Sequence, residues 1–406
     1  MSGYAHLSID TVADYLASTP EVRDLVDTSA LVDIREVGDG NLNLVFIITD
    51  AAGRGVVLKQ SLPYVRLVGP VWPMTPERAR REAHANRAHA RFAPSAVPHV
   101  HHFDTERYII TMEDLSDHTV WRTALNSGLR HDGAAEALGD YIARIAFGTS
   151  VLGAADPEAH KLRVAAAINP ELCTITEDLV FTEPWVDAGR NSVLPDNAVD
   201  ARAVADDAFM VARIGMAKWT FMTRAEALIH GDLHTGSVMV RAGGDGRVDS
   251  VRAIDSEFAF YGPIAFDLGA LWANYVIAAA RAGALGEGAR MRWCLNLISG
   301  TWHAFESTFR QQWPQRCDPR VFTDDVGERL LAQWQEEAWV FAAAKMTRRI
   351  IGLAKASDIE TLDPQVRVGA ARAVLRTAAL AVRECCADAD PDRLIGLAGE
   401  QIAAHT

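Results

Sequence analysis

One stretch of this 406-residue chain, His230-Gly-Asp-Leu-His-Thr-Gly-Ser237, constrains the fold more than any other. Apolar runs flank it on both sides, and a turn rich in Gly and Asp leads on to Val251-Arg-Ala-Ile-Asp-Ser-Glu257. The pattern predicts a strand, a loop, a second strand, a turn and a third strand that ends in two acids. Such an arrangement brings Asp232 close to Asp255 and Glu257.

Carboxylates gathered in this way suit phosphoryl transfer, in which one orients the attacking hydroxyl and others hold Mg²⁺ against nucleotide phosphates. The segment resembles the catalytic segment of kinases that phosphorylate small molecules on a protein-kinase-like fold. Those kinases place a metal-binding Asn where this chain has Ser237, and a hydroxyl is a weaker Mg²⁺ ligand than an amide carbonyl. We therefore expect Asp255 and Glu257 to carry most of the metal coordination. The structural alternative is a sharp surface turn capped by Asp and Ser.

The length and the net charge of the chain limit the classes of protein to which it can belong. A chain of 406 residues is too long for one compact core and suits two lobes. Its net charge of −13, from 40 basic and 53 acidic residues, argues against nucleic acid or an anionic membrane as the main partner. No apolar run is long enough to span a bilayer, and the N-terminus lacks a signal-peptide pattern. The five cysteines form no Cys-x-x-Cys pair, which suits a reducing compartment, so we expect a cytoplasmic protein.

Two predicted strands, Leu31–Val37 and Leu44–Thr49, flank a turn rich in Gly and Asn. A hairpin of this kind can fold over a triphosphate, with its backbone N–H groups meeting the phosphate oxygens. Glycine permits the close backbone approach, and asparagine side chains can donate further hydrogen bonds. The candidates are Gly38, Gly40, Asn41 and Asn43. Taken alone, the pattern fits a plain structural hairpin better.

Lys59 gives the hairpin a functional context, because it ends the next apolar strand, Val56–Lys59. A lysine at this place matches the kinase lysine that contacts the α- and β-phosphates. The charged helix predicted over Pro76–Phe92 offers Glu82 as the acidic partner of this lysine, with Glu77 as the second choice. The alternative is an edge-strand lysine and a helix whose charges are all solvated.

Residues 60–76 are predicted to form a proline-rich loop that carries Trp72. Long loops beside a site often act as lids, and a tryptophan on such a loop can cover a substrate. Equally, Trp72 can pack the loop down against its own lobe. Three histidines in the next segment, Val97–Phe103, lack a carboxylate or cysteine at ligand spacing and are interpreted as ordinary strand residues rather than a metal site.

The strand predicted over Tyr108–Leu115 would connect the two lobes of a kinase, with adenine bonded to backbone groups near Glu113 and Leu115. Beyond it the chain turns helical. We therefore divide the chain into an N-terminal nucleotide-binding lobe, residues 1–115, and a C-terminal catalytic and substrate-binding lobe, residues 116–406. The expected fold is α+β, protein-kinase-like and bilobal, with a small, mainly β N-lobe and a larger, mainly helical C-lobe.

Two features of the helical part carry charge into apolar surroundings. Asp267 is placed to brace the backbone of the catalytic loop, or to cap the helix predicted over Leu268–Tyr275. Arg348 and Arg349 lie in an Ala-rich helix predicted over Ala338–Lys355, where adjacent residues point about 100° apart and can bracket a pocket. Arginine can donate several hydrogen bonds to sugar hydroxyls or phosphoryl oxygens. From these residues alone, bonds to helix carbonyls or surface carboxylates are the simpler interpretation.

Taken in order, the motifs resemble the S-methyl-5-thioribose kinase family over about residues 36–358. The segments that carry the resemblance are Gly38–Phe46, Lys59-Gln60, Pro63–Arg66, Trp72–Met74, Met112–Ser116, Asn169–Cys173, His230–Ser237, Ile254–Pro263 and Arg348-Arg349-x-x-Gly352. This combination is far more specific than a single kinase motif. The family's usual Asp-Pro-Glu reads Asp-Ser-Glu here, and both acids remain.

The resemblance implies a homodimer that uses ATP and Mg²⁺ to phosphorylate the anomeric hydroxyl of methylthioribose, in methionine salvage. It implies that Asp232 contacts the sugar as base or orienter, and that Arg348 and Arg349 reach the substrate or the transferring phosphoryl group. Trp72 is a further substrate-binding candidate. The ATP-binding candidates are Gly38, Gly40, Asn41, Asn43, Lys59, Glu82, Glu113, Asp114, Leu115, Asp255, Ser256 and Glu257, and Asp255 and Glu257 would also bind the metal.

Two alternatives stay open. The chain could phosphorylate another small sugar or alcohol, such as 5-deoxyribose, an aminoglycoside or choline. Aminoglycosides and choline are cations that favour an acidic or aromatic cage, which a substrate-facing arginine pair disfavours. A nucleotide-binding pseudokinase would be expected to lack Asp232, Lys59 or the metal acids, and all of these are present.

Overall fold

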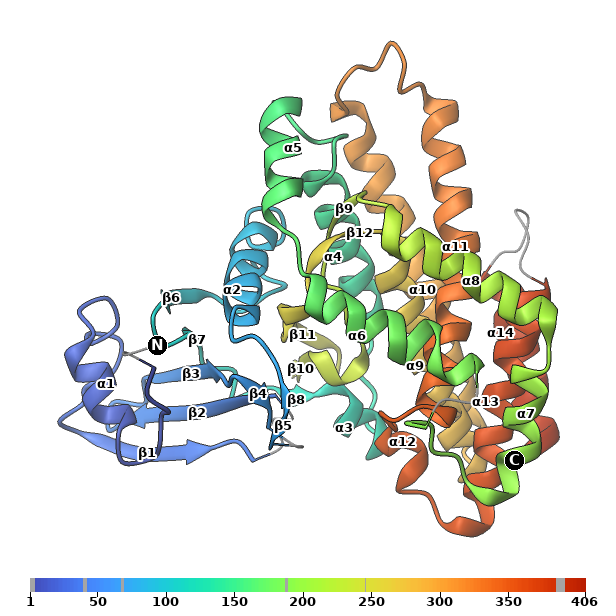
Figure 1. The fold of residues 1–406 in the computed structure, drawn as a ribbon, viewed down its shortest axis with the longest axis horizontal. Helices are drawn as coiled ribbons and strands as arrows, with labels where there is room; N and C mark the ends of the chain where they lie inside the picture. The colour runs from blue at the N-terminus through green and yellow to red at the C-terminus, as the bar shows by residue number, and fades with distance from the viewer. Residues whose placement is uncertain (1–3, 39–41, 67–68, 187–188, 245, 385–390) are drawn as a thin grey trace.

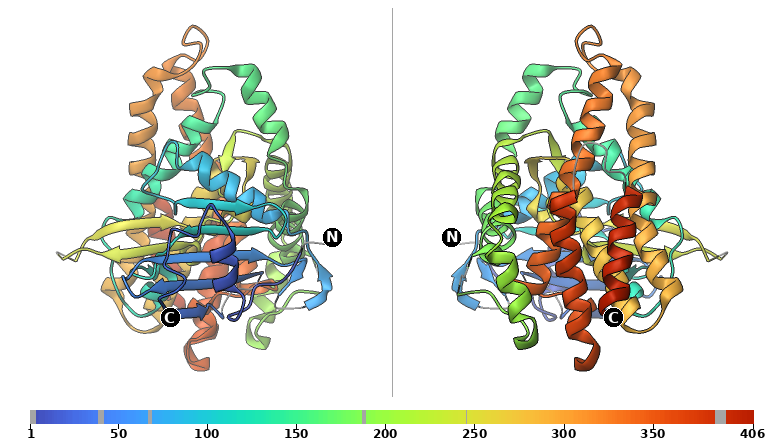
Figure 2. Two further views of the ribbon diagram at one scale, coloured as in Figure 1. Left: turned by 90° about the vertical axis from the view of Figure 1, so that its left-hand side faces the viewer. Right: turned by 90° about the vertical axis from the view of Figure 1, so that its right-hand side faces the viewer.

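The chain folds into a strand-rich N-terminal part and a larger helical part. A computed structural model describes every residue except 1–3, 39–41, 67–68, 187–188, 245 and 385–390. Figure 1 shows the sheet and α1 at one end of the molecule and the long helices at the other, and in Figure 2 the sheet faces the viewer in the left view and the long helices face the viewer in the right view. The predicted α+β, protein-kinase-like bilobal fold is confirmed. None of the helices in the described ranges combines the length and the apolar character that crossing a membrane requires.

The N-terminal part is built on a five-stranded antiparallel sheet in the order β1-β2-β3-β7-β6. Its strands are β1 (Leu31–Glu36), β2 (Asn43–Asp50), β3 (Gly55–Ser61), β6 (Val100–Asp104) and β7 (Ile109–Glu113). Alternate side chains of a strand share one face, and on one face Phe46, Ile48, Val56 and Leu58 pack with α1 (Val12–Ser18). The predicted strands and the pairing of the first two are confirmed, while Gly40 and Asn41 lie outside the described residues.

The first helix is shorter than predicted. Val12, Tyr15 and Leu16 recur at helical spacing and predict a helix over residues 10–30, but α1 ends at Ser18 and turns follow it. Pro20 explains the early end, because proline disfavours the α conformation in the preceding residue, and Thr19 is extended with ψ of 105°.

The segment predicted as a loop over residues 60–76 contains a small hairpin of β4 (Tyr64–Val65) and β5 (Gly69–Pro73). Prolines are tolerated here because each strand pairs on one side alone. The predicted charged helix follows as α2 (Arg78–His89), which lies between the sheet and the helical part (Figure 1).

Short strands frame the catalytic segment as predicted. They are β8 (Thr119–Val120), β9 (Ala227–Ile229), β10 (Val238–Ala242), β11 (Val248–Ala253) and β12 (Phe260–Gly262). β10 pairs with β11 and β8, and β9 pairs with β12, so the segment 230–237 emerges between two small sheets. Asp255 and Glu257, the two predicted acids, come shortly after β11. The N–H of Ile254 bonds to the carbonyl oxygen of Ser237, so the acids begin beside the end of the loop.

Helices make up the rest of the C-terminal part. They are α3 (Trp121–Asn126), α4 (Ala134–Thr149), α5 (Pro157–Ala166), α6 (Pro170–Phe181), α7 (Ala198–Ala205), α8 (Ala208–Thr223), α9 (Ala265–Ala284), α10 (Gly288–Gln312), α11 (Asp324–Ile351), α12 (Ser357–Glu360), α13 (Pro364–Glu384) and α14 (Pro391–His405). The sequence pattern predicts one helix over Val204–Thr223, but two helices cover this segment, because the Asp207 side chain accepts hydrogen bonds from the N–H groups of Phe209 and Met210 and so caps α8.

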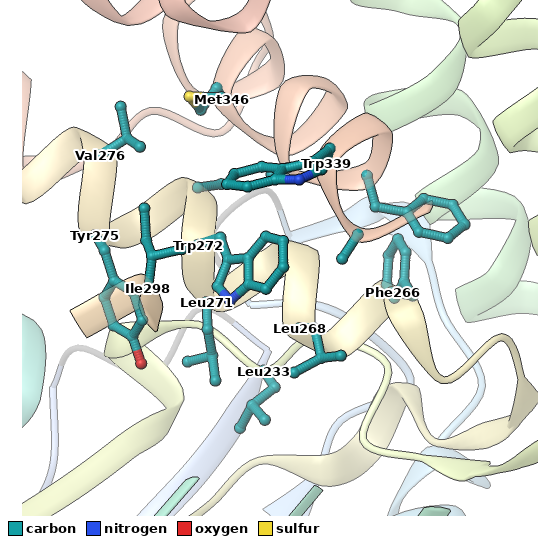
Figure 3. Close-up of a cluster of buried hydrophobic side chains, with 14 of the residues drawn as sticks. Leu233, Phe266, Leu268, Leu271, Trp272, Tyr275, Val276, Ile298, Trp339 and Met346 are labelled. Carbon is teal, nitrogen blue, oxygen red and sulfur yellow. The ribbon is translucent and has the colours of Figure 1, made fainter. Parts of the chain in front are cut away.

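The core of the helical part forms around α9. This helix is apolar on nearly all sides and packs against α10, α11 and α13, as expected of a helix that is buried all round. In Figure 3 Trp272 of α9 faces Trp339 of α11, and their ring centroids are 4.4 Å apart. Leu233 of the catalytic segment lies beside Leu268 and Leu271 in the same view, so packing in the core helps to fix the position of the loop.

Candidate active site

The catalytic loop is held by side chains that bond its backbone. The carboxylate of Asp267 accepts hydrogen bonds from the N–H groups of His230 and Gly231, at 2.7 and 3.0 Å. Gly231 has a φ of +83°, and a Cβ atom there would lie 2.3 Å from the carbonyl oxygen of Phe258. The bracing role predicted for Asp267 is confirmed, whereas its capping role is not, because Ile264 is the N-cap of α9 and Asp267 lies inside the first turn of the helix.

Two histidines of the segment also serve as backbone supports. His230 Nδ1 accepts from the N–H of Asp232 at 3.3 Å, so its Nε2 carries the proton and donates to Ile254 O at 2.8 Å. His234 Nδ1 accepts from the N–H of Gly236 at 3.0 Å, which leaves the proton on Nε2. Burial lowers the pKa of His234 to about 3, so this imidazole is neutral at ordinary pH.

Asp232 faces two donors. Lys345 Nζ of α11 lies 2.9 Å from its Oδ1, and His234 Nε2 lies 3.4 Å from its Oδ2. Burial alone would raise the pKa of Asp232, but the charge of Lys345 holds it well below its usual range. The carboxylate is therefore ionised, and it is better suited to orienting a hydroxyl than to removing its proton early.

Lys59 binds one carboxylate of its own N-terminal part and one carboxylate of the helical part. Its Nζ atom lies 2.8 Å from Glu82 Oε1 of α2 and 2.5 Å from Asp255 Oδ1. Burial would lower the pKa of Lys59, but the two carboxylates raise it above its usual value. The choice of Glu82 over Glu77 is confirmed, since Glu77 accepts hydrogen bonds from Arg80 and Tyr108 instead.

Glu257 is bound by two residues of the N-terminal part. Its Oε2 atom lies 3.2 Å from Arg78 Nε and accepts a hydrogen bond from Asn43 Nδ2 at 3.1 Å. Asn169, which precedes α6, fixes the same loop by donating to the carbonyl oxygens of Glu257 and Ala259, at 2.8 and 3.2 Å. These bonds place the second predicted metal acid at the boundary between the two parts.

The two acids fit a magnesium ion in number and in kind. Asp255 is 47% exposed, and Glu257 has its Oε1 atom available because Arg78 and Asn43 both bind Oε2. No cluster of three or more His, Cys, Asp or Glu able to hold a metal occurs in the described part of the chain. Nucleotide phosphates and water would have to supply the remaining oxygens, as is usual for Mg²⁺. Asp255 adopts the left-handed conformation, with φ of 63° and ψ of 41°, which marks a constrained position.

The other predicted nucleotide residues are less closely gathered. Ser256 Oγ lies 3.3 Å from Asn86 Oδ1 of α2, and Gly38 has open space around it. Glu113 ends β7 and pairs with Arg252 at 3.3 Å. Asp114 accepts from Ser116, and the carbonyl oxygen of Leu115 accepts from the N–H of His118.

Trp72 packs against residues of both parts of the molecule. It lies against an apolar cluster of Val65 and Met74 from its own loop and Leu172 of α6, and the guanidinium of Arg190 lies 5.5 Å from its ring centroid. The alternative in which Trp72 packs against its own lobe is therefore confirmed, and the same side chain also meets the helical part.

The arginine pair lies beside Asp232 with Lys345. Burial lowers the pKa of both arginines, that of Arg349 well below its usual value, and Arg348 adds repulsion to the latter. Arg348 Nε is buried without a hydrogen-bond partner among the described residues. Cations crowded and incompletely satisfied in this way suit an anionic or hydroxyl-rich ligand.

Sequence reasoning missed four residues of the site: Lys345, Arg78, Arg122 and Asn169. Arg122 of α3 pairs with Asp358 at 3.2 Å and donates to Asn274 at 2.7 Å, close to the arginine pair. A lysine three residues before Arg348 shares its helix face, which was an available signal for Lys345. Arg78 resembled the other charges of α2 and gave no such signal.

The fold and the site together define a phosphotransferase. A family model described as the phosphotransferase enzyme family matches residues 33–304. Methylthioribose kinase from Yersinia pseudotuberculosis is 38% identical over 361 residues, 87% of this chain and 87% of the relative. The methylthioribose kinase of Cronobacter sakazakii is 38% identical over 369 residues, 89% of this chain and 91% of the relative. The chain belongs to the methylthioribose kinase family.

Proposed function

We propose that the chain transfers the γ-phosphate of ATP to the anomeric hydroxyl of S-methyl-5-thioribose, giving S-methyl-5-thioribose 1-phosphate, in methionine salvage. The similarity to methylthioribose kinases over 87% of the chain supports the substrate. The observation that carries the chemistry is that His234 faces both Asp232 and Asp255, so that the Lys59–Asp255 pair and the catalytic-loop carboxylate, which are distant in the sequence, meet around one histidine.

In this proposal the N-terminal lobe, residues 1–115, binds the nucleotide and residues 116–406 bind the sugar. Lys59, kept in place by Glu82, contacts the α- and β-phosphates, and Asp255 and Glu257 would hold Mg²⁺, which neutralises charge on the phosphates when bound. The remaining nucleotide contacts are assigned to Gly38, Gly40, Asn41, Asn43, Ser256, Glu113, Asp114 and Leu115.

Asp232 acts on the acceptor. Its carboxylate accepts a hydrogen bond from the anomeric hydroxyl and aims the oxygen at the γ-phosphorus. The O–P bond to the sugar forms as the bond to the β-phosphate oxygen breaks, and Asp232 takes the hydroxyl proton late, since Lys345 keeps the carboxylate ionised. Arg348 and Arg349 bind the transferring phosphoryl group or the sugar, and Trp72 covers the sugar.

Turnover with defined sugars tests this function. ADP release is measured with methylthioribose, 5-deoxyribose, ribose and no sugar, each with and without Mg²⁺. Fast, Mg²⁺-dependent turnover with methylthioribose is expected. Inactivity with every sugar, combined with measurable ATP binding, would contradict the substrate and keep the fold-level interpretation.

A second substrate, 5-deoxyribose, is favoured by its chemistry, because it lacks only the methylthio group. Apolar pockets discriminate such increments by about 1–3 kcal/mol. We expect kcat/KM for the two sugars to be comparable, and a ratio beyond roughly a thousandfold would exclude dual use.

We further propose a cytoplasmic homodimer. Helix α8 carries exposed apolar side chains, Met216, Trp219 and Met222, which are candidates for contact with a second copy. Light scattering after size-exclusion chromatography is expected to give twice the 44.2 kDa mass of the chain. A monomer at micromolar concentration would contradict the proposal.

A further inference from the structure

Lys345 is a buried cation on the helix that carries the arginine pair. Its side chain is 4% exposed, and its ammonium lies 2.9 Å from Oδ1 of Asp232, whose side chain is 20% exposed. The two residues are separated by 113 positions in the sequence. The contact therefore depends on the docking of α11 against the catalytic segment.

The residues around Lys345 determine where its ammonium group lies. Its Nζ atom lies 4.5 Å from the ring centroid of Phe266, one of the α9 residues labelled in Figure 3, so the ring face supports the ammonium from one side. The chain neighbours Ala344 and Met346 are buried and apolar. An apolar side chain would fill this position without loss of packing, so packing alone gives no reason for a charge here.

The charged and titratable groups around the contact are mostly cations. Those that face Asp232 are Lys345, Arg348 and Arg349 from α11 and His234 from its own segment, and those that face Lys345 are Asp232, Arg348, Arg349 and Asp267. Asp232 is the carboxylate that Lys345 contacts directly, and Asp267 is occupied by the backbone of the catalytic loop. The ammonium consequently acts on Asp232 rather than on the loop.

We propose that Lys345 is a positioning residue for phosphoryl transfer, in which its ammonium fixes the Asp232 carboxylate by Oδ1 and leaves the Oδ2 edge to the acceptor hydroxyl. This inference rests on the proposed function. Asp232 has four lone-pair sites, of which Lys345 and His234 take one on each oxygen. The hydroxyl thus meets an anchored carboxylate whose charge persists until its proton moves.

A double-mutant cycle tests whether Lys345 works through Asp232. The variants are Lys345→Met, Lys345→Arg, Asp232→Asn and the double variant Lys345→Met/Asp232→Asn. Lys345→Met should lower kcat by about 10²-fold and leave KM for ATP within about threefold, because the acceptor and not the nucleotide is misplaced. In the Asp232→Asn background the same change should alter the residual kcat by less than about threefold. The matched control is Lys218→Met on α8, which loses a bond to Thr182, a residue with no assigned role in the site, and should leave kcat unchanged.

The pH profile separates positioning from packing. Without its cation the buried Asp232 carboxylate protonates more readily, so the acid limb of kcat should move to higher pH by about one unit or more in Lys345→Met. Lys345→Arg keeps the positive charge, so the acid limb of kcat should stay at its wild-type pH in this variant. If the acid limb of kcat does not move in Lys345→Met, the proposal is overturned. The same holds if Lys345→Met lowers kcat as much in the Asp232→Asn background as in the wild type.

Crystal structures of the variants give a readout that needs no sugar substrate. The Asp232 carboxylate should leave its place in Lys345→Met and keep it in Lys345→Arg. An unmoved carboxylate in Lys345→Met overturns the positioning role even if methylthioribose is not the substrate. Conversely, if the wild-type enzyme does not phosphorylate methylthioribose and the Asp232 carboxylate still leaves its place in Lys345→Met, only the proposed function is contradicted.

Discussion

The Oδ2 atom of Asp267 accepts a hydrogen bond of 2.7 Å from the main-chain N–H of His230, while Oδ1 accepts one from the next residue. One buried carboxylate in the first turn of α9 thus fixes two consecutive peptide groups at the entrance to the catalytic loop. The position of Asp232 follows from this brace as much as from its own contacts.

Asp267→Asn should destabilise the catalytic loop without creating a cavity in the core. The amide keeps the shape of the carboxylate but turns an NH₂ group toward a backbone N–H, which costs about 1–3 kcal/mol of the free energy of unfolding. We expect kcat to fall by about 10²-fold because Asp232 is displaced. Urea unfolding and steady-state kinetics measure the two effects, and an unchanged kcat would contradict the bracing role.

Gly231→Ala should damage both stability and turnover. The residue has a φ of +83°, and the new Cβ would lie 2.3 Å from Phe258 O. Strain of this kind costs about 1–3 kcal/mol. Gly244→Ala is the matched control, because nothing lies within 4 Å of the added Cβ there. Equal melting temperatures for the two variants would show that the left-handed position is not required.

Arg78→Met should be strongly destabilising. The guanidinium is buried, pairs with Glu257 and donates to the carbonyl oxygens of Leu62 and Leu42, both at 2.7 Å. Breaking a buried pair costs about 3–5 kcal/mol because the other charge is left uncompensated. Arg80→Met, two residues along α2, removes an exposed ion pair and should cost less than about 1 kcal/mol. Urea unfolding of both variants measures the difference.

Asp232→Ala and Asp255→Ala should each abolish turnover and leave the fold intact. The first removes the group proposed to orient the acceptor, and the second removes a proposed metal ligand together with one partner of Lys59. Wild-type activity should be lost on adding a chelator and regained with Mg²⁺. Retained activity in either purified, folded variant would refute the assigned roles, and circular dichroism verifies the fold.

His89 should make the protein sensitive to acid. Its Nε2 donates to Leu228 O and its Nδ1 accepts from Tyr141, both at 2.9 Å, and burial lowers its pKa to about 4. The unfolded chain binds this proton near pH 6.5, so stability is complete above that pH and falls as the pH drops toward 4. The loss is on the order of 3 kcal/mol. His89→Gln should show a shallower dependence of the free energy of unfolding between pH 6.5 and 4, and an equally steep one would contradict the assignment.

Much of the site could be predicted because its signals are local. Lys59 follows a glycine-rich hairpin, and Asp255 follows a strand by two residues, so short-range pattern and turn chemistry were sufficient. Glu82 was chosen on helix position, and the structure pairs it with Lys59. The early end of α1 could also have been predicted, since Pro20 is visible in the sequence.

The residues that were missed depend on tertiary packing. Arg78 sits among other charges of α2, and its complete burial follows from the docking of β2 and the Glu257 loop on this helix. Lys345 lies in an Ala-rich helix whose partner is 113 residues away. Periodicity indicates which face of a helix is apolar, but it does not say which distant carboxylate meets an isolated cation on that face.

Lys59 and Arg78 belong to the strand-rich part, whereas Asp255 and Glu257, their partners, belong to the helical part. A hinge motion that widened the space between the two parts would have to separate both pairs together, one of them almost wholly shielded from water. Because neither pair can be stretched without stretching the other, the more deeply buried Arg78–Glu257 pair limits how far the two parts can separate.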